Sequence, residues 1–200
     1  MNLCFIVNFY NEIHIIERCL SSIRCHYPNS ELILISDGNN DPELKNIAER
    51  CSARLVLDVR LKTLRHGGRW VHRYCNEFYK GISDLLIKVD PDSIMHRKFT
   101  EIPASDYFGP LVPGWPFPLI NGSCKGFSRK LASLIVENKL ALSRHYVGNA
   151  QFKRGFDRQI SEDLICMDIV NKTKTVFSDW SEINITPNID CKYSVTHGHK

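Results

Sequence analysis

Four short apolar runs, separated by segments with helical periodicity, constrain the fold of the first half of this 200-residue chain. The runs cover residues 3–7, 31–35, 54–59 and 84–89 and are rich in leucine, isoleucine and valine, as buried strands are. Helical patterns at 12–26, 41–51 and 68–81 lie between them. Strands that alternate with helices predict a parallel sheet with helices on both faces, a three-layer α/β/α fold.

The polar segments that follow these strands are expected at one edge of the sheet. NFYNE follows the first run, SDGNND the second and DPDS the fourth. Because crossovers between parallel strands are right-handed, the C-terminal ends of the strands share one edge, where ligands bind in open α/β sheets. The sequence therefore predicts a binding site built from these three segments.

The second half of the chain is less regular. The segment 109–126 is rich in proline and glycine and predicts loops. Helices are predicted near 129–142 and 161–171, followed by a short strand at 175–178. No linker or repeat separates the halves, so a single domain over 1–200 is predicted, with 1–100 and 101–200 as its two functional halves.

Composition excludes several classes of protein. The chain is 43% hydrophobic and 24% charged with a formal net charge of +4, which is ordinary globular composition. Without a block of lysine and arginine, no nucleic-acid partner is expected. The eight cysteines form no C-x-x-C pair, so neither a zinc site nor a thioredoxin-type motif is indicated. The apolar runs are too short for a transmembrane segment or a signal peptide, and we expect a cytoplasmic, reduced protein.

The DPDS segment places two carboxylates after a buried strand. In extended backbone Asp90 and Asp92 project to the same side, because side chains alternate with period two. Two such carboxylates suit a hard divalent cation that keeps positions open for diphosphate oxygens. The alternative is a type I turn with Pro91 at its second position, and the local sequence gives both interpretations similar weight.

The ordered blocks FIVNFYNE, ILISDGNND, GGRWVHRYCNEFYKGISDLLIKVDPDS, NGSCKGFSR and SEDL resemble those of GT-A fold glycosyltransferases. They are most similar to family 2 and its relatives. The resemblance implies a mostly parallel central sheet and transfer of a sugar from a nucleoside diphosphate sugar to a hydroxyl acceptor. It favours a UDP-sugar donor and implies Mn²⁺ or Mg²⁺ as the cofactor. Inversion is the expected outcome, with a retaining relative as the alternative.

The resemblance also implies roles for residues at the donor side. The base and ribose would be held by the first polar segment, and the diphosphate by the metal. The matching positions are Asn8, Tyr10, Glu12 and Asp37 for the nucleoside and Asp90 and Asp92 for the metal. Two positions depart from the family, which often has proline where Asn8 stands and an acid where Ser36 stands.

The predicted helix 68–81 adds a basic residue to the donor side. Arg73 lies on a polar stripe with Arg69, Asn76 and Lys80. Such a stripe is usually solvated, but the N-terminal end of this helix is expected near the phosphates, and Arg73 is the residue we expect to bind there.

The SEDL segment carries the predicted catalytic acids. Asp163 matches the family's base, and Glu162 is expected to orient a loop or a substrate hydroxyl. General-base assistance of this kind is worth roughly 10²- to 10⁴-fold in rate. The alternative is purely local, since acids in the first turn of a helix complement its dipole.

The C-terminal segment YSVTHGHK alternates like a strand and places two histidines on one side. The resemblance implies His197 as a third metal ligand, with His199 as the fallback. Chain ends are also where disorder concentrates, and a frayed end is the alternative.

Two rival functions share this scaffold. A sugar-nucleotide nucleotidyltransferase would show a glycine-rich basic loop after the first strand, where this chain has NFYNE. A non-catalytic nucleotide-sugar-binding protein would not need Asp90, Asp92, Glu162 and Asp163 together.

Overall fold

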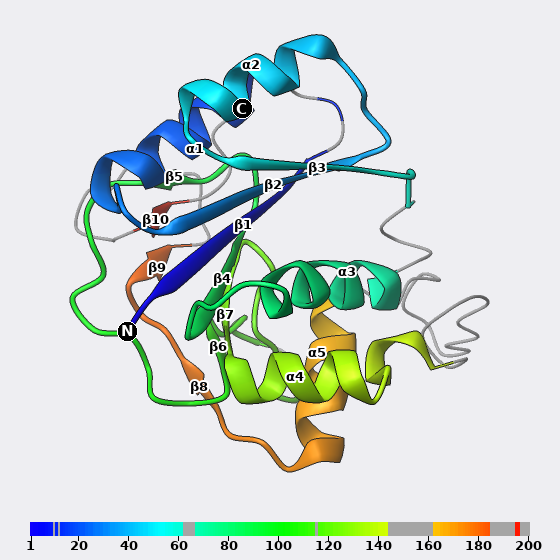
Figure 1. The fold of residues 1–200 in the computed structure, drawn as a ribbon. Helices are drawn as coiled ribbons and strands as arrows, with labels where there is room; N and C mark the ends of the chain where they lie inside the picture. Colours follow the sequence, from blue (N-terminus) through cyan, green and yellow to red (C-terminus); the bar gives the residue numbers. More distant parts are fainter. Residues whose placement is uncertain are drawn as a thin grey trace.

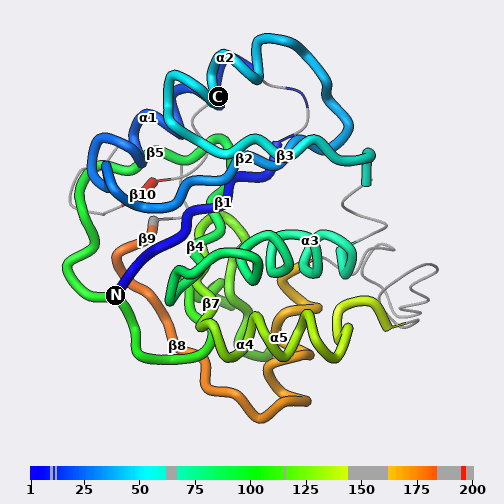
Figure 2. Tube along the Cα trace, viewed as in Figure 1, coloured from blue at the N-terminus to red at the C-terminus, as the bar shows by residue number. Residues whose placement is uncertain are grey.

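The computed structural model describes residues 1–9, 11, 13–61, 67–114, 116–143, 162–184 and 195–196. The chain path is drawn in Figures 1 and 2. The helices are α1 (Ile13–His26), α2 (Pro42–Arg50), α3 (Gly67–Tyr79), α4 (Arg129–Glu137), the 3₁₀ turn η2 (Leu140–Leu142) and α5 (Glu162–Thr173). The strands are β1 (Leu3–Phe9), β2 (Glu31–Asp37), β3 (Arg54–Asp58), β4 (Leu85–Val89), β5 (Ile94–Met95), β6 (Tyr107–Gly109), β7 (Cys124–Ser128), β8 (Phe177–Asp179), β9 (Ile183–Asn184) and β10 (Val195–Thr196).

A seven-stranded sheet forms the centre of the molecule. Its strand order is β3-β2-β1-β4-β7-β6-β8. β1, β2, β3 and β4 pair in parallel, whereas β7 is antiparallel to both of its neighbours, β4 and β6. β8 then pairs in parallel with β6. The sheet is therefore mostly parallel, as predicted.

Helices cover both faces of this sheet (Figure 1). α1 and α2 pack on one face, and α3, α4 and α5 pack on the other. α5 lies beside α3, although these two helices are far apart in the sequence (Figure 2). The side chains of β1 alternate between the two faces: Cys4 and Ile6 join the core under α3, while Phe5 and Val7 join the core under α1. Both faces being covered, the predicted three-layer α/β/α fold is confirmed.

Local sequence signals explain the elements of the first half. The four predicted strands are present, and α1 buries the side chains of its periodic apolar positions. α2 begins after Asp41, whose carboxylate accepts a hydrogen bond of 2.9 Å from the Glu43 N–H. Gly38 follows β2 with φ at +78°, a conformation that glycine adopts without strain.

The second half contains strands that the sequence did not predict. β6 and β7 lie in or beside the segment expected to form loops, and they extend the sheet beyond β4. The predicted helix 129–142 is also shorter than expected. α4 ends at Glu137, and the chain turns at Lys139, whose φ is +50°, before η2. A left-handed residue cannot continue a right-handed helix, which explains the break.

A small three-stranded sheet connects the end of the chain to the segment after β4. Its order is β5-β10-β9, with Thr196 opposite Ile94 and Val195 opposite Met95. Within the predicted C-terminal strand, Val195–Thr196 are extended, and the rest of that segment lies outside the described residues. Within the described ranges, no helix has the length and apolar character that crossing a membrane requires.

Candidate active site

The predicted site lies where β1, β2 and β4 end. Val7 of β1 is opposite Val89 of β4, so the residues that follow, Asn8 and Asp90, are level across the sheet. The Oδ1 atom of Asn8 is buried and has no hydrogen-bond partner among the described residues. Tyr10 and Glu12 lie outside the described residues. The edge therefore contains an unsatisfied buried acceptor at the position expected to meet the nucleoside.

Asp37 and Arg73 are brought together at this edge. Asp37, at the end of β2, is 3% exposed and accepts hydrogen bonds from the Leu61 N–H and from Arg73 Nη1, the latter at 3.4 Å. Burial raises the pKa of the Asp37 carboxyl, and this effect outweighs the opposite effects of the Leu61 N–H and Arg73. The Asp37 carboxylate is thus held at the sheet edge although burial removes water from its charged form.

Arg73 does not lie on a solvated stripe. Its side chain is 9% exposed, and its Nε is 2.7 Å from Oδ2 of Asp58, at the end of β3. Nη2 donates to the Val59 carbonyl at 2.9 Å, and the guanidinium lies 5.0 Å from the centre of the Trp70 ring. Arg73 thus lies at this edge, and the alternative of a merely solvated stripe is wrong for this residue.

Asp90 and Asp92 lie in a turn that closes directly after β4. The Ser93 N–H donates to the Asp90 carbonyl at 3.1 Å, and the Asp90 N–H donates to the Ser123 carbonyl at 2.8 Å. On the α1 side, the Cys19 thiol lies 3.6 Å from the Asp90 carbonyl oxygen. The turn and the presentation of carboxylates are therefore not alternatives, because the turn fixes the backbone while the Asp90 side chain remains 30% exposed.

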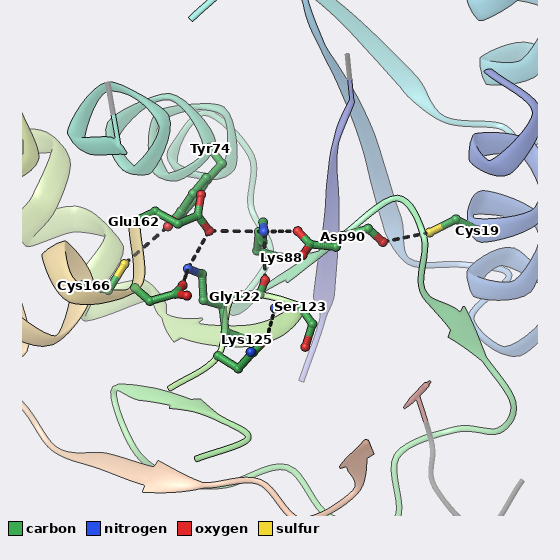
Figure 3. Close-up of polar contacts among 11 residues, drawn as sticks. Cys19, Tyr74, Lys88, Asp90, Gly122, Ser123, Lys125, Glu162 and Cys166 are labelled. Carbon is green, nitrogen blue, oxygen red and sulfur yellow. Dashed lines mark hydrogen bonds and ion pairs between the residues drawn. The ribbon is translucent and has the colours of Figure 1, made fainter. Parts of the chain in front are cut away.

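Two buried lysines lie directly behind this turn (Figure 3). Lys88 of β4 is the register partner of Lys125 of β7. Their side chains are 5% and 0% exposed and lie on the α5 face of the sheet, as do Leu86 and Phe127 two residues away. Lys88 donates to Asp90 Oδ1 and, at 2.8 Å, to the Gly122 carbonyl.

The acids of the SEDL segment begin α5 and face these lysines. Glu162 Oε1 is 2.6 Å from Lys125 Nζ and 3.2 Å from Lys88 Nζ. Asp163 Oδ1 is 2.8 Å from Lys125 Nζ. Both predicted catalytic acids are thus close to the end of β4, and they are linked to Asp90 through the lysines.

The charges in this cluster control one another's protonation. Burial acts to raise the pKa of Glu162, but the Lys125 and Lys88 ammonium groups more than offset this and lower it to about 2. Burial likewise acts to lower the pKa of Lys88, while Asp90 and Glu162 raise it well above the ordinary lysine value. Glu162, Lys88 and Lys125 are therefore all charged at neutral pH. With its lowered pKa, the Glu162 carboxylate is a weak base for accepting a proton from a substrate.

Gly122 allows Asp163 to approach the loop before β7. A Cβ atom at this position would lie 2.7 Å from Asp163 Oδ1, closer than non-bonded atoms can approach. A side chain at this position would displace the Asp163 carboxylate, so the glycine of the NGS segment leaves room for that carboxylate.

The donor set suits a divalent cation only in part. Asp90 and Asp92 supply hard oxygen ligands, and with Glu162, Asp163 and the two lysines the cluster carries a formal excess of two negative charges. Among the described residues, however, no group of three or more His, Cys, Asp or Glu side chains is arranged to hold a metal. His197 and His199 lie outside the described residues. The residues present fit a metal whose remaining ligands come from a bound substrate or from the C-terminal segment.

Sequence reasoning missed Lys88 and Lys125. The available signal was the single lysine within the otherwise apolar run LLIKV, because a strand buried on both faces rarely contains an uncompensated charge. Lys125 gave no comparable signal, since its strand was not predicted.

The first half of the chain is similar to a known protein family. Residues 4–99 match the sequence model of glycosyl transferase family 2. No curated protein matches the chain. Among solved structures, a mannosyltransferase from Pyrobaculum calidifontis, PcManGT, in complex with GDP-Man and Mn²⁺, is similar at 16% identity and a TM-score of 0.49. That match covers 67% of this chain, which spans 46% of the length of the other chain.

The family match contains β1–β4, Asp37, Arg73 and both carboxylates of DPDS, which lie at the predicted site. The mostly parallel sheet continues into the second half, where α5 brings Glu162 and Asp163 to the same edge. Residues 4–99 are therefore similar to glycosyl transferase family 2, and they form part of a three-layer, mostly parallel α/β fold.

Proposed function

We propose that this protein is a metal-dependent glycosyltransferase that moves a sugar from a nucleoside diphosphate sugar to a hydroxyl acceptor, with inversion at the anomeric carbon. One observation carries the proposal: Asp90 and Asp163 lie on two sides of a single ion-paired cluster at the C-terminal edge of the sheet. Asp90, as the proposed metal ligand, and Asp163, as the proposed base, would thus act on the same substrate.

The donor would lie across the ends of β1, β2 and β4. Asn8, Asp37 and Arg73 would contact the nucleoside or its phosphates, with Tyr10 and Glu12 as further contacts. The unsatisfied Oδ1 of Asn8 supports this assignment, because a ligand N–H or O–H would satisfy it. The preference for UDP rests on the family resemblance alone.

Asp90 and Asp92 would hold Mn²⁺ or Mg²⁺, with His197 as a third ligand and His199 as the fallback. When bound, the cation would stabilise the negative charge of the departing nucleoside diphosphate. The antiparallel pairing of β10 with β5 supports the His197 assignment, because it places Thr196, the residue before His197, opposite Ile94, two residues after Asp92.

Asp163 would act as the general base. The acceptor oxygen would form a bond to the anomeric carbon as the bond to the diphosphate oxygen breaks, and the hydroxyl proton would pass to the Asp163 carboxylate. Lys125 would keep that carboxylate in place. Residues 1–100 would then serve the donor and residues 101–200 the acceptor and the base.

A screen of the purified chain against nucleoside diphosphates and their sugars, with and without Mn²⁺, tests the proposal. Thermal unfolding should shift upward only when metal and a matching nucleotide are present together. The matching sugar nucleotide should release its nucleoside diphosphate when an acceptor is supplied. If no nucleotide stabilises the protein in either condition, the proposal is wrong.

A further inference from the structure

Two like charges lie side by side at the centre of the site. Lys88 and Lys125 are register partners on β4 and β7, and neither side chain is more than 5% exposed. Like charges on adjacent strands repel each other, and a buried ammonium needs a counter-ion. The fold therefore has to compensate two positive charges at this point.

Glu162 provides that compensation for both lysines at once. Its Oε1 lies between the two ammonium groups (Figure 3). Each lysine has one further carboxylate on its own side, Asp90 for Lys88 and Asp163 for Lys125. The charges thus alternate in sign from Asp90 through Lys88, Glu162 and Lys125 to Asp163.

The Lys88 ammonium has three oxygen contacts in this arrangement. It donates hydrogen bonds to Asp90 and to the Gly122 carbonyl, and it forms an ion pair with Glu162 at 3.2 Å. A divalent cation at Asp90 would compete with one of them. Glu162 and the Gly122 carbonyl would then keep the Lys88 ammonium in place. Without Glu162, Asp90 would be the sole carboxylate of Lys88, and the lysine would resist losing it.

We infer that Glu162 is a positioning residue for metal binding: by neutralising the buried lysine pair, it releases Asp90 from Lys88 so that Asp90 can ligate the cation. The inference rests on the proposed function, since it assumes that Asp90 is a metal ligand. It assigns Glu162 a role on the donor side, whereas a residue that orients the acceptor would leave donor binding unchanged.

Calorimetric titration of the full chain with UDP in the presence of Mn²⁺ tests this, with Mn²⁺ alone followed by electron paramagnetic resonance. Glu162→Gln keeps the shape of the side chain and removes its charge. The affinity for Mn²⁺ and for Mn²⁺ with UDP should fall by about tenfold or more. The reason is that one charge a few ångströms away changes an ionic equilibrium constant by about tenfold, or one pK unit, or more. The double variant Glu162→Gln/Lys88→Met removes the uncompensated lysine as well, and its affinity should return to within about threefold of wild type.

Glu77→Gln is the matched control. Glu77 is also a buried acid that ion-pairs with two cations, Arg54 at 2.7 Å and Lys80, but Arg54 begins β3 at the opposite edge of the sheet. Glu77→Gln should lower thermal stability and leave the affinity for Mn²⁺ with UDP unchanged. A loss of affinity in Glu162→Gln alone is then not a consequence of reduced stability.

The outcomes separate the inference from the proposed function. If the wild-type chain binds neither Mn²⁺ nor any nucleotide, the proposed function fails and the inference with it. If wild type binds and Glu162→Gln binds equally well, or if the double variant stays as weak as Glu162→Gln, the inference alone is overturned. Should Glu162→Gln not fold, the double variant has to fold and bind, and its failure to do so overturns the inference too.

Discussion

The Lys125 ammonium lies 2.8 Å from Oδ1 of Asp163, and its side chain has no exposed surface. A buried lysine on the central sheet thus fixes the carboxylate of the second residue of α5. Glu162, one residue earlier, contacts the same ammonium at 2.6 Å but also contacts Lys88. Two adjacent acids in one helical turn therefore have different environments, and we expect them to have different roles.

Asp163→Asn should reduce sugar transfer by at least ~10²-fold, because an amide cannot accept the acceptor proton. Binding of Mn²⁺ with UDP should be retained, since Asp163 lies on the far side of the cluster from Asp90. The rate of nucleoside diphosphate release and a nucleotide titration measure the two effects. Asp168→Asn, which alters the exposed Asp168–Lys172 pair on the same helix, is the matched control and should transfer sugar normally. If Asp163 only complements the helix dipole, its substitution will cost on the order of 0.5 kcal/mol of stability and leave transfer intact.

Asp92→Asn should abolish Mn²⁺-dependent nucleotide binding while leaving the fold intact, because the turn at 90–93 is held by backbone hydrogen bonds. Thermal shift with Mn²⁺ and UDP measures the binding, and circular dichroism measures the fold. Asp84→Asn is a suitable control: Asp84 precedes the same strand at its other end, where it accepts a hydrogen bond of 2.7 Å from the Asn2 N–H. Unchanged UDP binding by Asp92→Asn would mean that the turn aspartates are structural.

Asp37→Asn should weaken nucleotide binding without lowering stability at pH 7. Burial raises the pKa of this carboxyl, so the folded chain holds the Asp37 proton more tightly than the unfolded chain does. The contribution of Asp37 to the free energy of unfolding therefore falls as pH rises above its ordinary pKa of ~4. Arg73 keeps its ion pair with Asp58 at 2.7 Å in the variant.

Urea unfolding of wild type and Asp37→Asn between pH 4 and pH 7 checks the sign, since the stability of wild type relative to the variant should decrease across this range. A relative stability that instead increases with pH would show that Asp37 serves the fold rather than a ligand.

The sequence predicted the first half of the fold because its signals there are local. β1–β4 are continuous apolar runs, and α1 and α2 show helical periodicity, with Asp41 as a cap before Pro42. Parallel topology then required their polar ends to meet, so Asp37 and Asp90 could be assigned to one edge before their contacts were known. The burial of Arg73 could not be predicted, because its partner Asp58 comes from another strand.

The strands of the second half could not be predicted from local sequence, for a physical reason. β7 reads CKGFS, in which a lysine and a glycine interrupt the apolar pattern. Its extended conformation comes from pairing with β4 and β6, a tertiary effect that no local pattern encodes. Gly126 also faces the Phe108 ring so closely that a Cβ atom could not fit. The lysine pair was invisible for the same reason, since Lys88 and Lys125 meet only through that pairing.

The last prediction concerns the C-terminal segment. β10 is two residues long and is held between β5 and β9, with Thr196 opposite Ile94, two residues after Asp92. If His197 ligates the metal, binding of Mn²⁺ with UDP should add an attachment directly after this short strand. Hydrogen exchange at the Val195 and Thr196 amides should therefore slow when both are added, and by less with either alone. His197→Ala should remove this added protection and weaken Mn²⁺-dependent UDP binding. His199→Ala is the matched control and should behave as wild type, whereas the reverse pattern would assign the ligand to His199. Equal exchange with and without Mn²⁺ and UDP, together with normal binding by both variants, would show that neither histidine contacts the metal.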